Sequence, residues 1–429
     1  MEKPDITVYK FGGASLKNAE ALRNAVEILK NCAHSPLILV VSAIGKTTNA
    51  LEKIHEARFN GDVKEAIARM AELENIHMNI VNELFQEKTH QIYSDLQASF
   101  AGLRNAIEMS PEPRFDESYD RIVGYGEEVA SIIVAAYLKD SGLFVELADA
   151  RKLIITDDNF RDAYVNWDLS KERILSFCNR VFEENPKTIV LTQGFISGTE
   201  DGRPTTLGRE GSDFTASVFA FCTDAVEMHI WKDVQGILNA DPKIMPEAEF
   251  LAHLSYRETV ELAYYGASVI HPKTIKPLEN KRIPLYVRSF LNPEQPGTCI
   301  NQDMSDDREK ASYIFKFNQI LISVLPKDFS FINEKNLSDI FTVLSRNNIR
   351  VRMMQNSAVS FSFCCDNDVV KMPMLIKDLQ MRFNVRYNEN VELITIRHYS
   401  NAELKDVVRS RKILMEQKSR STHQIIVKS

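Results

Sequence analysis

The stretch Ile6-Thr-Val-Tyr-Lys-Phe-Gly-Gly-Ala-Ser-Leu16 decides the fold class of this chain, because a short β-prone run ends there in two glycines. Residues 18–30 follow with apolar side chains at spacings of three and four, which predicts an amphipathic helix. The next segment, Leu37-Ile-Leu-Val-Val41, is apolar at every position, as is typical of a parallel strand covered on both faces. Strand, helix and buried strand in this order open a βαβ unit, so we expect an α/β fold.

The same alternation continues to about residue 300. Further strand patterns lie at Phe144–Leu147, Thr188–Thr192, Val226–Trp231 and Leu285–Val287. Between the third and fourth of these, a helix is predicted to begin at the capping box Ser255/Glu258 and to end at Gly266. Residues 62–110 keep a helical period, which predicts helices inserted into or flanking the sheet, with a role as a lid or a subunit-contact wall.

A polar, acid-rich segment, Asn301–Lys310, is typical of a linker. Beyond it we expect two small β-α-β repeats. The first has the predicted elements Ile314–Leu325, Leu337–Arg346 and Val359–Cys364, and the shorter second one has Val391–Ile396, Ala402–Arg411 and His423–Val427. The expected domains are therefore a catalytic domain at 1–300 with a helical insertion at about 60–115, a linker at 301–312 and a regulatory α+β region at 313–429.

Composition excludes several classes of protein. The 429 residues include 52 Lys+Arg and 59 Asp+Glu, a net charge of −7, which argues against nucleic-acid binding over the whole surface. No apolar run approaches the length of a membrane span, and the first residues do not resemble a signal peptide. The six cysteines include no C-x-x-C pair and are typical of reduced thiols. We expect a cytoplasmic protein with no membrane and no nucleic-acid partner.

Two glycine-containing segments could bind phosphate. In Lys10-Phe-Gly-Gly13, backbone N–H groups and an ammonium could meet an anion, although Gly-Gly by itself favours a strand-ending turn with a solvated lysine. The loop Gly194–Asp213 follows a buried strand, has five glycines, and feeds a helix that begins near Ser212 or Asp213. Such a helix N-terminus is a ready anion site. The spacing matches neither a P-loop nor the dinucleotide fingerprint.

Three weaker segments leave alternatives open. Trp231–Pro242 places two acids and a glycine after a strand, where a nucleotide or its metal could bind, or where the acids are ordinary turn residues. Gly124–Glu128 offers a carboxylate beside flexible backbone, which a helix N-terminus also favours. His271, before a proline, is more typical of a structural residue than of a base.

Taken in order, these motifs resemble the aspartate kinases of the amino-acid kinase family over about residues 5–300, and the tail from about 313 resembles their ACT domains. The matching segments are Lys10–Gly13, Val40–Ala43, Gly126-Glu127, Gly194–Ile196, Thr205–Arg209, Gly211–Asp213, Trp231, Asp233-Val234, Asp241-Pro242, Tyr265–Ala267 and His271-Pro272. The resemblance implies a three-layer amino-acid kinase fold followed by a ferredoxin-like, ACT-like regulatory region. It also implies transfer of the ATP γ-phosphate to the β-carboxylate of L-aspartate, the first step of lysine, threonine and methionine biosynthesis.

The resemblance also assigns roles. Lys10 and Asp213 would be catalytic, and Ser42, Glu127, Arg209 and Thr206 would bind aspartate, with Arg209 on a carboxylate and Glu127 facing the α-ammonium. Nucleotide binding would fall to Gly12, Gly13, Lys232, Asp233, Gly236 and Asp241. No residue is reserved for metal, and Mg²⁺ would be carried by ATP with few protein ligands.

The sequence departs from the family pattern in several places. Glu210 stands where better-known members have a second glycine, Lys232 replaces a threonine, and Leu291 replaces a lysine that touches nucleotide. In the tail, Ala358 replaces a glutamate that meets a cationic effector in lysine-inhibited relatives. Either the effector (lysine or threonine) differs or regulation is lost; Asn336 and Asn356 are the candidate effector contacts.

Two other functions remain open at this point. One is a related kinase acting on glutamate or N-acetylglutamate; the loop Thr205–Asp213 and the ACT-like tail favour aspartate. The other is an amino-acid sensor with an inactive kinase half, against which Lys10, Arg209 and Asp213 argue. ACT domains commonly pair across subunits, so we expect a homodimer or a higher homo-oligomer.

Overall fold

The computed structural model describes residues 5–32, 36–109, 114–267, 270–328, 330–400, 407–408 and 411–428. Two compact units share the chain. Unit 1 comprises Met1–Ile237, Phe250–Val260 and Ile270–Met304, and unit 2 comprises Leu238–Glu249, Glu261–Val269 and Ser305–Ser429. No helix among the described residues is both long enough and apolar enough to cross a bilayer.

Unit 1 is built on an eight-stranded sheet with the order β11-β13-β12-β8-β1-β2-β5-β3. All neighbouring strands run parallel except β12 and β13, which are antiparallel. The strand bounds are β1 Thr7–Phe11, β2 Leu37–Val41, β3 Val145–Ala148, β5 Ile189–Gln193, β8 Glu227–Lys232, β11 His253–Ser255, β12 Leu285–Ser289 and β13 Thr298–Asn301. The continuous apolar strands of the sequence are thus the central, parallel ones, as expected.

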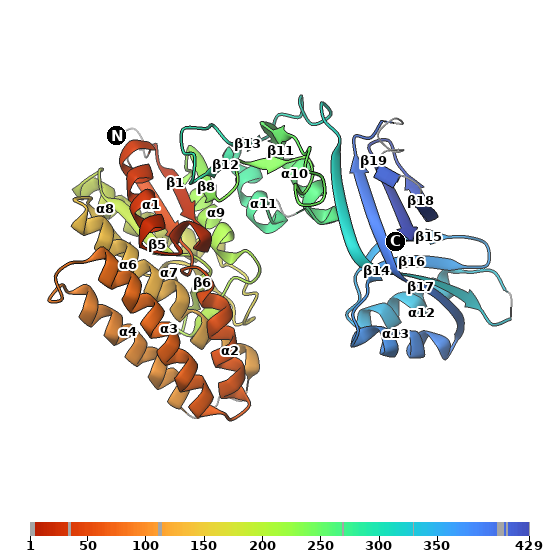
Figure 1. Ribbon diagram of the computed structural model, residues 1–429, viewed down its shortest axis with the longest axis horizontal. Helices are drawn as coiled ribbons and strands as arrows, with labels where there is room; N and C mark the ends of the chain where they lie inside the picture. Colours follow the sequence, from red (N-terminus) through yellow and green to blue (C-terminus); the bar gives the residue numbers. More distant parts are fainter. Residues whose placement is uncertain are drawn as a thin grey trace. The chain divides into compact units, whose positions relative to one another are not determined.

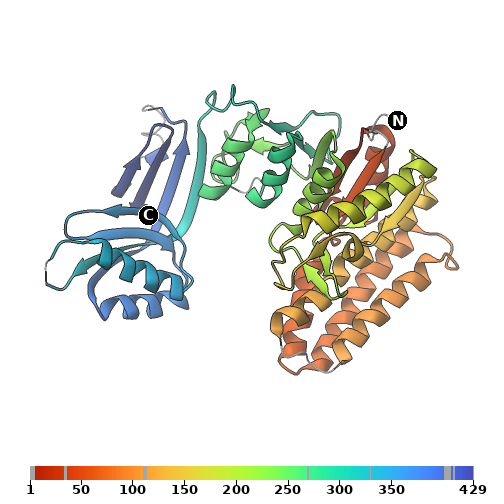
Figure 2. The same cartoon turned by 180° about the vertical axis from the view of Figure 1, so that it is seen from behind.

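Helices cover both faces of this sheet (Figures 1 and 2). Helix α9 (Gly211–Thr223) packs on β1, β2 and β8. On the other face, α1 (Ala19–Cys32) and α6 (Tyr125–Asp140) share a core with Tyr9, Phe11 and Leu39. Alternate side chains of one strand point to opposite faces, so Tyr9 and Phe11 join this core while Lys10 faces α9. The predicted α/β fold is confirmed.

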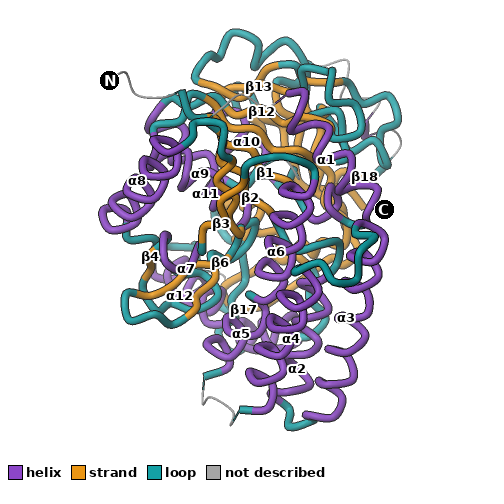
Figure 3. Tube along the Cα trace, turned by 90° about the vertical axis from the view of Figure 1, so that its left-hand side faces the viewer, coloured by secondary structure: helices purple, strands orange, loops and turns teal. Residues whose placement is uncertain are grey.

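The region between β2 and β3 is a group of helices that lie side by side (Figures 1 and 3). Besides α6, it contains α2 Thr47–Phe59, α3 Val63–Leu84, α4 Ile92–Glu108 and α5 Phe115–Val123. Helix α2 begins before the expected insertion, and the sequence analysis did not predict it, because its apolar positions are interrupted by polar and basic residues (Thr48, Asn49, Lys53).

Smaller elements complete unit 1. They are η1 Gly13–Leu16, α7 Ala150–Leu153, α8 Trp167–Glu184, α11 Pro272–Lys281, β10 Phe250–Leu251, and the three-stranded sheet of β4 Ile155–Thr156, β6 Ile196–Thr199 and β7 Pro204–Thr206. Helix α10 (Tyr256–Tyr265) follows β11, and the hydrogen bond from Glu258 N to Ser255 Oγ (2.9 Å) supplies half of the predicted capping box. Strand β9 spans Ile237–Leu238.

Unit 2 has one six-stranded antiparallel sheet, in the order β15-β16-β14-β17-β19-β18. Its elements are β14 Ser312–Pro326, α12 Glu334–Arg346, β15 Val351–Asn356, β16 Phe361–Asp366, α13 Lys371–Gln380, β17 Phe383–Arg397, β18 Lys412–Lys418 and β19 Thr422–Lys428. The order β14-α12-β15-β16-α13-β17 is a complete ferredoxin-like unit. The fold class expected for the tail is confirmed, although α13 was not predicted.

The second repeat is not a separate β-α-β copy. Strands β14 and β17 are each 15 residues long, and their far halves pair with each other and with β19 in the same sheet. The helix predicted at Ala402–Arg411 falls mostly outside the described residues.

Two segments that we expected inside the catalytic domain belong to unit 2, namely Leu238–Glu249 and Glu261–Val269. Hydrogen bonds explain the first of them: Asn239 Nδ2 donates to Ala311 O (2.9 Å), and Tyr313 N donates to Asn239 O (2.7 Å). For the second, the guanidinium of Arg397 lies 3.4 Å from Glu261 Oε2. These long-range contacts leave no trace in the local sequence pattern.

Candidate active site

A buried ion pair lies at the carboxyl end of β1. Lys10 Nζ is 2.5 Å from Asp213 Oδ1, and Asp213 stands in the first turn of α9. Both residues are buried, with exposed fractions of 8% and 4%. Parallel strands collect their carboxyl ends at one edge of the sheet, where α/β proteins bind ligands. The structure therefore brings together the two residues predicted to be catalytic, although they are far apart in the sequence.

The charge state of Asp213 follows from its surroundings. Burial would raise the pKa of this carboxyl, but the ammonium groups of Lys10 and Lys232 hold the pKa below its ordinary value. Asp213 is therefore ionised at neutral pH and can hold the Lys10 side chain in place.

Backbone of the glycine turn after β1 lies beside the Lys10 ammonium. A Cβ placed on Gly12 would lie 3.5 Å from Lys10 Nζ, so the ammonium lies beside this backbone. A Cβ on Gly13 would come within 2.7 Å of Ala43 O and 2.9 Å of Gly45 O. Only glycine fits at position 13, which lets η1 pack against the turn after β2.

Glu127 lies in the first turn of α6 and is 3% exposed. Its Oε1 accepts a hydrogen bond from Ala43 N (3.2 Å), whereas its buried Oε2 has no hydrogen-bond partner among the described residues. Burial raises the pKa of this carboxyl to about 8, against the lowering effects of the Ala43 hydrogen bond and the Lys10 charge. Ser42, which precedes Ala43, is partly exposed at the end of β2. A cationic group at Oε2 would satisfy this buried carboxylate.

Thr206 is held by a residue that the sequence analysis missed. Asp120, in α5, accepts hydrogen bonds from Thr206 N (2.9 Å), Thr206 Oγ1 (2.7 Å) and Arg161 N (3.0 Å). Burial raises the pKa of Asp120 to about 6, and these hydrogen bonds oppose the rise. The Thr206 hydroxyl thus donates within the protein, and its predicted contact with substrate would use its lone pairs. An isolated acid outside the predicted elements carries no sequence signal for this role.

Arg209 and Glu210 follow in the same loop. Arg209 is exposed and makes no ion pair with a described residue. Glu210 has a left-handed backbone (φ 53°), and its Oε2 accepts a hydrogen bond from His271 N (2.9 Å). The Glu210 carboxylate is therefore directed to the N-terminus of α11. His271 itself accepts a hydrogen bond from Lys273 N at Nδ1 (3.2 Å), which fits the predicted structural role.

Three of the predicted nucleotide residues, Lys232, Asp233 and Gly236, lie at or shortly after the end of β8. Lys232 ends this strand and is close enough to lower the pKa of Asp213, while Asp233 is exposed in the following turn. Gly236 is buried, and a Cβ there would meet Phe250 and Thr298 at 2.6 Å. Asp241 belongs to unit 2, where its Oδ1 accepts a hydrogen bond from Lys243 N (2.9 Å).

Leu291, which stands where the family pattern has a lysine, is 61% exposed. The leucine therefore places an apolar side chain in solvent at this position. Near it, the Arg288 guanidinium lies 4.8 Å from the ring centroid of Trp231 and donates to Pro293 O. Arg288 is thus committed to contacts within unit 1.

The predicted effector residues lie in unit 2. Asn336 forms a capping box with Asn333 at the start of α12, with both hydrogen bonds present (3.0 and 3.1 Å). Asn356 is exposed at the end of β15. Asn336 therefore has a structural role whether or not an effector binds.

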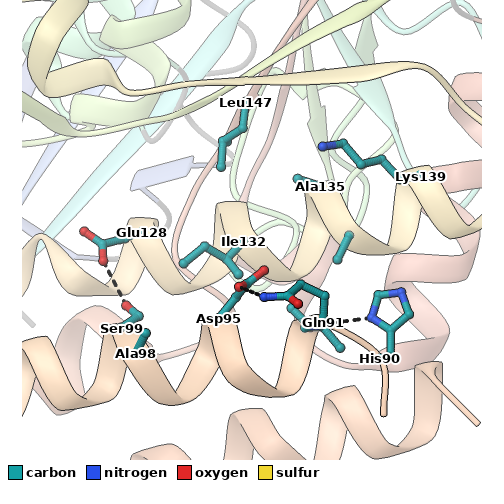
Figure 4. Close-up of a pocket in the computed structure, with 12 residues that line it drawn as sticks. His90, Gln91, Asp95, Ala98, Ser99, Glu128, Ile132, Ala135, Lys139 and Leu147 are labelled. Atoms are coloured by element: carbon teal, nitrogen blue, oxygen red, sulfur yellow. Dashed lines mark hydrogen bonds between the residues drawn. The ribbon is translucent and has the colours of Figure 1, made fainter. Parts of the chain in front are cut away.

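A groove of about 620 Å³ between α4 and α6 contains none of the predicted site residues (Figure 4). Glu128 lines this groove. Its carboxylate accepts a hydrogen bond from Ser99 Oγ (2.9 Å) and forms an ion pair with Arg151 (2.7 Å). Successive helix residues point in different directions, so Glu127 and Glu128 serve different surroundings. Among the residues the structure describes, no group of three or more His, Cys, Asp or Glu side chains is placed to hold a metal ion.

Comparison with known proteins agrees with this geometry. The model of the amino acid kinase family matches residues 5–289. The chain belongs to the amino acid kinase family, as the sequence motifs predicted.

Within that family, the similar proteins are aspartokinases. The aspartokinase of Chlamydia pneumoniae is 30% identical over 403 residues, which cover 91% of this chain and 84% of the relative. A bifunctional aspartokinase/homoserine dehydrogenase of Buchnera aphidicola is 30% identical over 389 residues, 87% of this chain. This chain spans about half (46%) of the length of that bifunctional relative.

Solved structures of Escherichia coli aspartokinase III share the fold. The crystal structure with lysine and aspartate has a TM-score of 0.81 and 25% identity, and covers 99% of this chain and 96% of its own. The structure with aspartate and ADP has a TM-score of 0.80 at 24% identity, with the same coverage.

Proposed function

We propose that this protein is an aspartate kinase, which transfers the γ-phosphoryl group of ATP to the β-carboxylate of L-aspartate and releases 4-phospho-L-aspartate and ADP. One observation carries the choice of an amino acid as substrate: the buried Glu127 Oε2 has no hydrogen-bond partner among the described residues, and the Lys10 ammonium lies close enough to lower the pKa of this carboxyl. An α-ammonium group would complete this carboxylate. The similarity to aspartokinases supports aspartate as the amino acid.

Phosphoryl transfer to a carboxylate requires the protein mainly to position the reactants and to offset negative charge. A β-carboxylate oxygen is already a nucleophile, so no general base is needed. It attacks the γ-phosphorus, the bond from that phosphorus to the bridging oxygen breaks, and ADP leaves with the bridging oxygen. Negative charge spreads over the γ-phosphoryl oxygens in the transition state. In our proposal Lys10, held by Asp213, offsets this charge, and the backbone at Gly12 and Gly13 approaches the phosphates.

Aspartate itself would be held at both ends. Glu127 faces the α-ammonium, Arg209 pairs with a carboxylate, and Ser42 adds a hydroxyl contact. Asp120 is a positioning residue, because it fixes the loop that carries Thr206 and Arg209.

Mg²⁺ enters this proposal only as part of the nucleotide. Asp213, at the start of α9, is already paired with Lys10, and the described residues include no group of three or more His, Cys, Asp or Glu side chains placed to hold a metal ion. Mg²⁺ on the ATP phosphates would offset their charge.

Regulation belongs to the same proposal. Unit 2 would bind an amino-acid effector, lysine or threonine, and pair with a second copy of the chain. Its ferredoxin-like unit supports this, as does the crystallisation of E. coli aspartokinase III with lysine. Light scattering with and without each amino acid would measure the oligomeric state.

The direct test is acyl-phosphate formation from ATP, trapped with hydroxylamine, with L-aspartate, L-glutamate and N-acetyl-L-glutamate as separate acceptors. Aspartate-dependent product alone supports the proposal. Product with either glutamate compound would assign a related carboxylate kinase, and no product with any acceptor would favour an amino-acid sensor. Repeating the assay with lysine and threonine tests regulation.

The role of Glu127 is tested by Glu127→Gln, which keeps shape and removes charge. We expect the KM for aspartate to rise about 30-fold, since removing one partner of a buried charge pair costs about 2 kcal/mol, while the KM for ATP stays constant. Glu172→Gln, at an exposed position of α8, is the matched control. An equal rise in both KM values would contradict the assigned role.

A further inference from the structure

A second cavity in unit 1, of about 740 Å³, is lined by the N-terminus of α8, by α9, by α11 and by the segment 161–165. Of the predicted site residues only Arg209 lines it; Lys10, Ser42 and Glu127 do not. This volume is within the range of small-molecule sites. The cavity is therefore distinct from the place where we put the reacting groups, although it shares one wall with it.

Aromatic side chains form the floor of this cavity. The Trp167 ring packs edge-to-face on Phe221 (4.9 Å between centroids, 69° between planes) and on Phe214 (6.3 Å, 79°). These contacts fix the orientation of Trp167, which remains partly exposed. Tyr164 is 66% exposed beside it. A planar ring entering the cavity would meet Tyr164 and Trp167 without displacing a packed side chain.

The charged groups around this floor are mostly cationic: four cationic side chains line the cavity against one carboxylate, Asp162. Lys273 Nζ neutralises Asp162 at 2.7 Å and also donates to Leu207 O (2.9 Å). Arg161 is engaged by Asp116 and by the Phe115 and Tyr119 rings. The other two cations, Arg209 and Lys276, make no ion pair with any residue the structure describes. Two uncompensated cations beside an apolar floor favour an anionic ligand.

We propose that this cavity is a binding site for a small planar aromatic anion, an aromatic carboxylate or an aromatic phosphate ester. Its ring lies against Tyr164 and Trp167, and its anionic group meets Arg209 and Lys276. Aromatic carboxylates and aromatic phosphate esters both combine a planar ring with an anionic group. If the two cations contribute most of the binding energy, the phosphate ester, with two negative charges, binds more tightly.

The site is coupled to the loop that carries Arg209. Lys273 ties Asp162 to Leu207 O, and Ala163 N donates to Thr206 O (3.0 Å). Gly208 has a left-handed backbone (φ 74°), and a Cβ there would lie 2.6 Å from Asp162 Oδ1, so the two segments are in close contact. A ligand that engages Arg209 from this side removes it from the substrate. This part rests on the proposed function and predicts a higher KM for aspartate with unchanged kcat.

Binding can be measured without any kinase assay. The chain has two tryptophans: Trp231 is fully buried in the core, and Trp167 lines the cavity. Tryptophan fluorescence of the full chain is titrated with benzoate, phenyl phosphate, the neutral benzamide and inorganic phosphate, without ATP or aspartate. We expect a saturable change with the two aromatic anions, and at least about tenfold weaker binding of the neutral and the ring-less probes. Trp167→Phe should abolish the signal.

Variants test the assigned contacts. Lys276→Glu should weaken binding of both aromatic anions about tenfold, and Tyr164→Ala should weaken it less. Lys187→Glu makes the same charge change at an exposed position outside the cavity and should leave binding unchanged. Circular dichroism of each variant verifies the fold. No saturable change with either aromatic anion, or equal weakening by Lys187→Glu, would overturn the site.

The coupling is tested separately through aspartate kinetics. A raised KM for aspartate with benzoate present, abolished by Lys276→Glu, supports it. Fluorescence binding with an unchanged KM would refute the coupling and leave the site standing. Fluorescence binding in a protein that phosphorylates no acceptor would refute the proposed function alone.

Discussion

The two units treat buried charge differently. In unit 1, Lys10, Asp213 and Glu127 are buried at or near strand ends, and one Glu127 oxygen has no hydrogen-bond partner among the described residues. In unit 2, the buried Arg397 lies 3.4 Å from Glu261 Oε2 and donates to the Thr422 hydroxyl (2.7 Å). A buried charge that stabilises only the fold has hydrogen-bond and ion-pair partners within the protein, whereas a buried charge that binds a ligand lacks one of these partners. This difference separates the candidate site from a structural pair of which only Arg397 is buried.

The largest expected effect comes from breaking one pair in each unit. Lys10→Ala should lower the free energy of unfolding by about 3 kcal/mol, because it leaves the buried Asp213 carboxylate without its partner. Arg397→Ala should lower it by less, because the Glu261 side chain is 35% exposed and water can solvate its carboxylate. Only Lys10→Ala should also lower turnover, by about 10³-fold, because it removes charge stabilisation from the transition state. Urea unfolding and hydroxylamine trapping measure the two quantities.

The comparison fails if Arg397→Ala lowers kcat as much as Lys10→Ala under conditions where both variants are folded. Undiminished turnover in Lys10→Ala would refute the role of Lys10. Lys10→Arg, which keeps the charge, should retain most of the stability.

The next largest effect is a pH dependence of the KM for aspartate, which we expect to depend on the Glu127 carboxyl. The pKa of Glu127 is raised to about 8 in the unliganded protein, so the carboxyl is mostly protonated at neutral pH and cannot pair with an ammonium group. Aspartate must then displace a proton, and its KM should fall about tenfold as the pH rises from about 7 to about 9. Initial rates across this range measure it, with Glu127→Gln as a control that should show a flat profile; a KM that rises with pH would contradict the assignment.

A smaller effect is expected from the support of the Thr206 loop. Asp120→Asn keeps the shape but removes the charge. The amide oxygen can still accept from the N–H groups of Arg161 and Thr206, but these hydrogen bonds are no longer charge-assisted, and the amide nitrogen must face Thr206 Oγ1, which then has to accept instead of donate. We expect a loss of about 1–2 kcal/mol in unfolding free energy and a rise of about fivefold in the KM for aspartate. Asp116→Asn, an exposed change on the same helix, serves as the reference. If the KM is unchanged while stability falls, Asp120 supports the fold alone.

The smallest effect is expected at Glu210, where the sequence departs from its relatives. Glu210→Gly relieves a left-handed backbone but removes the hydrogen bond to His271 N, and the two changes nearly cancel. We expect unfolding free energy within about 1 kcal/mol of the parent and a KM for ATP within about twofold. A large fall in the KM for ATP would place this carboxylate near the phosphates during turnover.

Local patterns predicted the parts of the molecule that depend on local structure. Strand β2 was predicted from its continuous apolar run and β1 from a short β-prone run, and the Ser255 cap because its spacing is fixed. The residues around Lys10 and Glu127 were identified through a family resemblance, and the structure brings Lys10 and Asp213 together.

Long-range structure was beyond the sequence. Asp120 acts on residues 41 and 86 positions away, and Asn239 joins unit 2 through hydrogen bonds to residues more than 70 positions away. Helix α13 was missed because its pattern is short and contains Pro373. None of these features has a local signature, because each depends on which segments meet after folding.

The two long strands of unit 2 have a consequence for how it folds. Strands β14 and β17 each run the whole length of the six-stranded sheet. Asn318 in β14 and Asn390 in β17 have left-handed backbone conformations and lie where the β14–β17 pairing shifts register. Neither half of the sheet has a central strand of its own. A division between them would cut the two strands that they share, so we expect the two halves to unfold together.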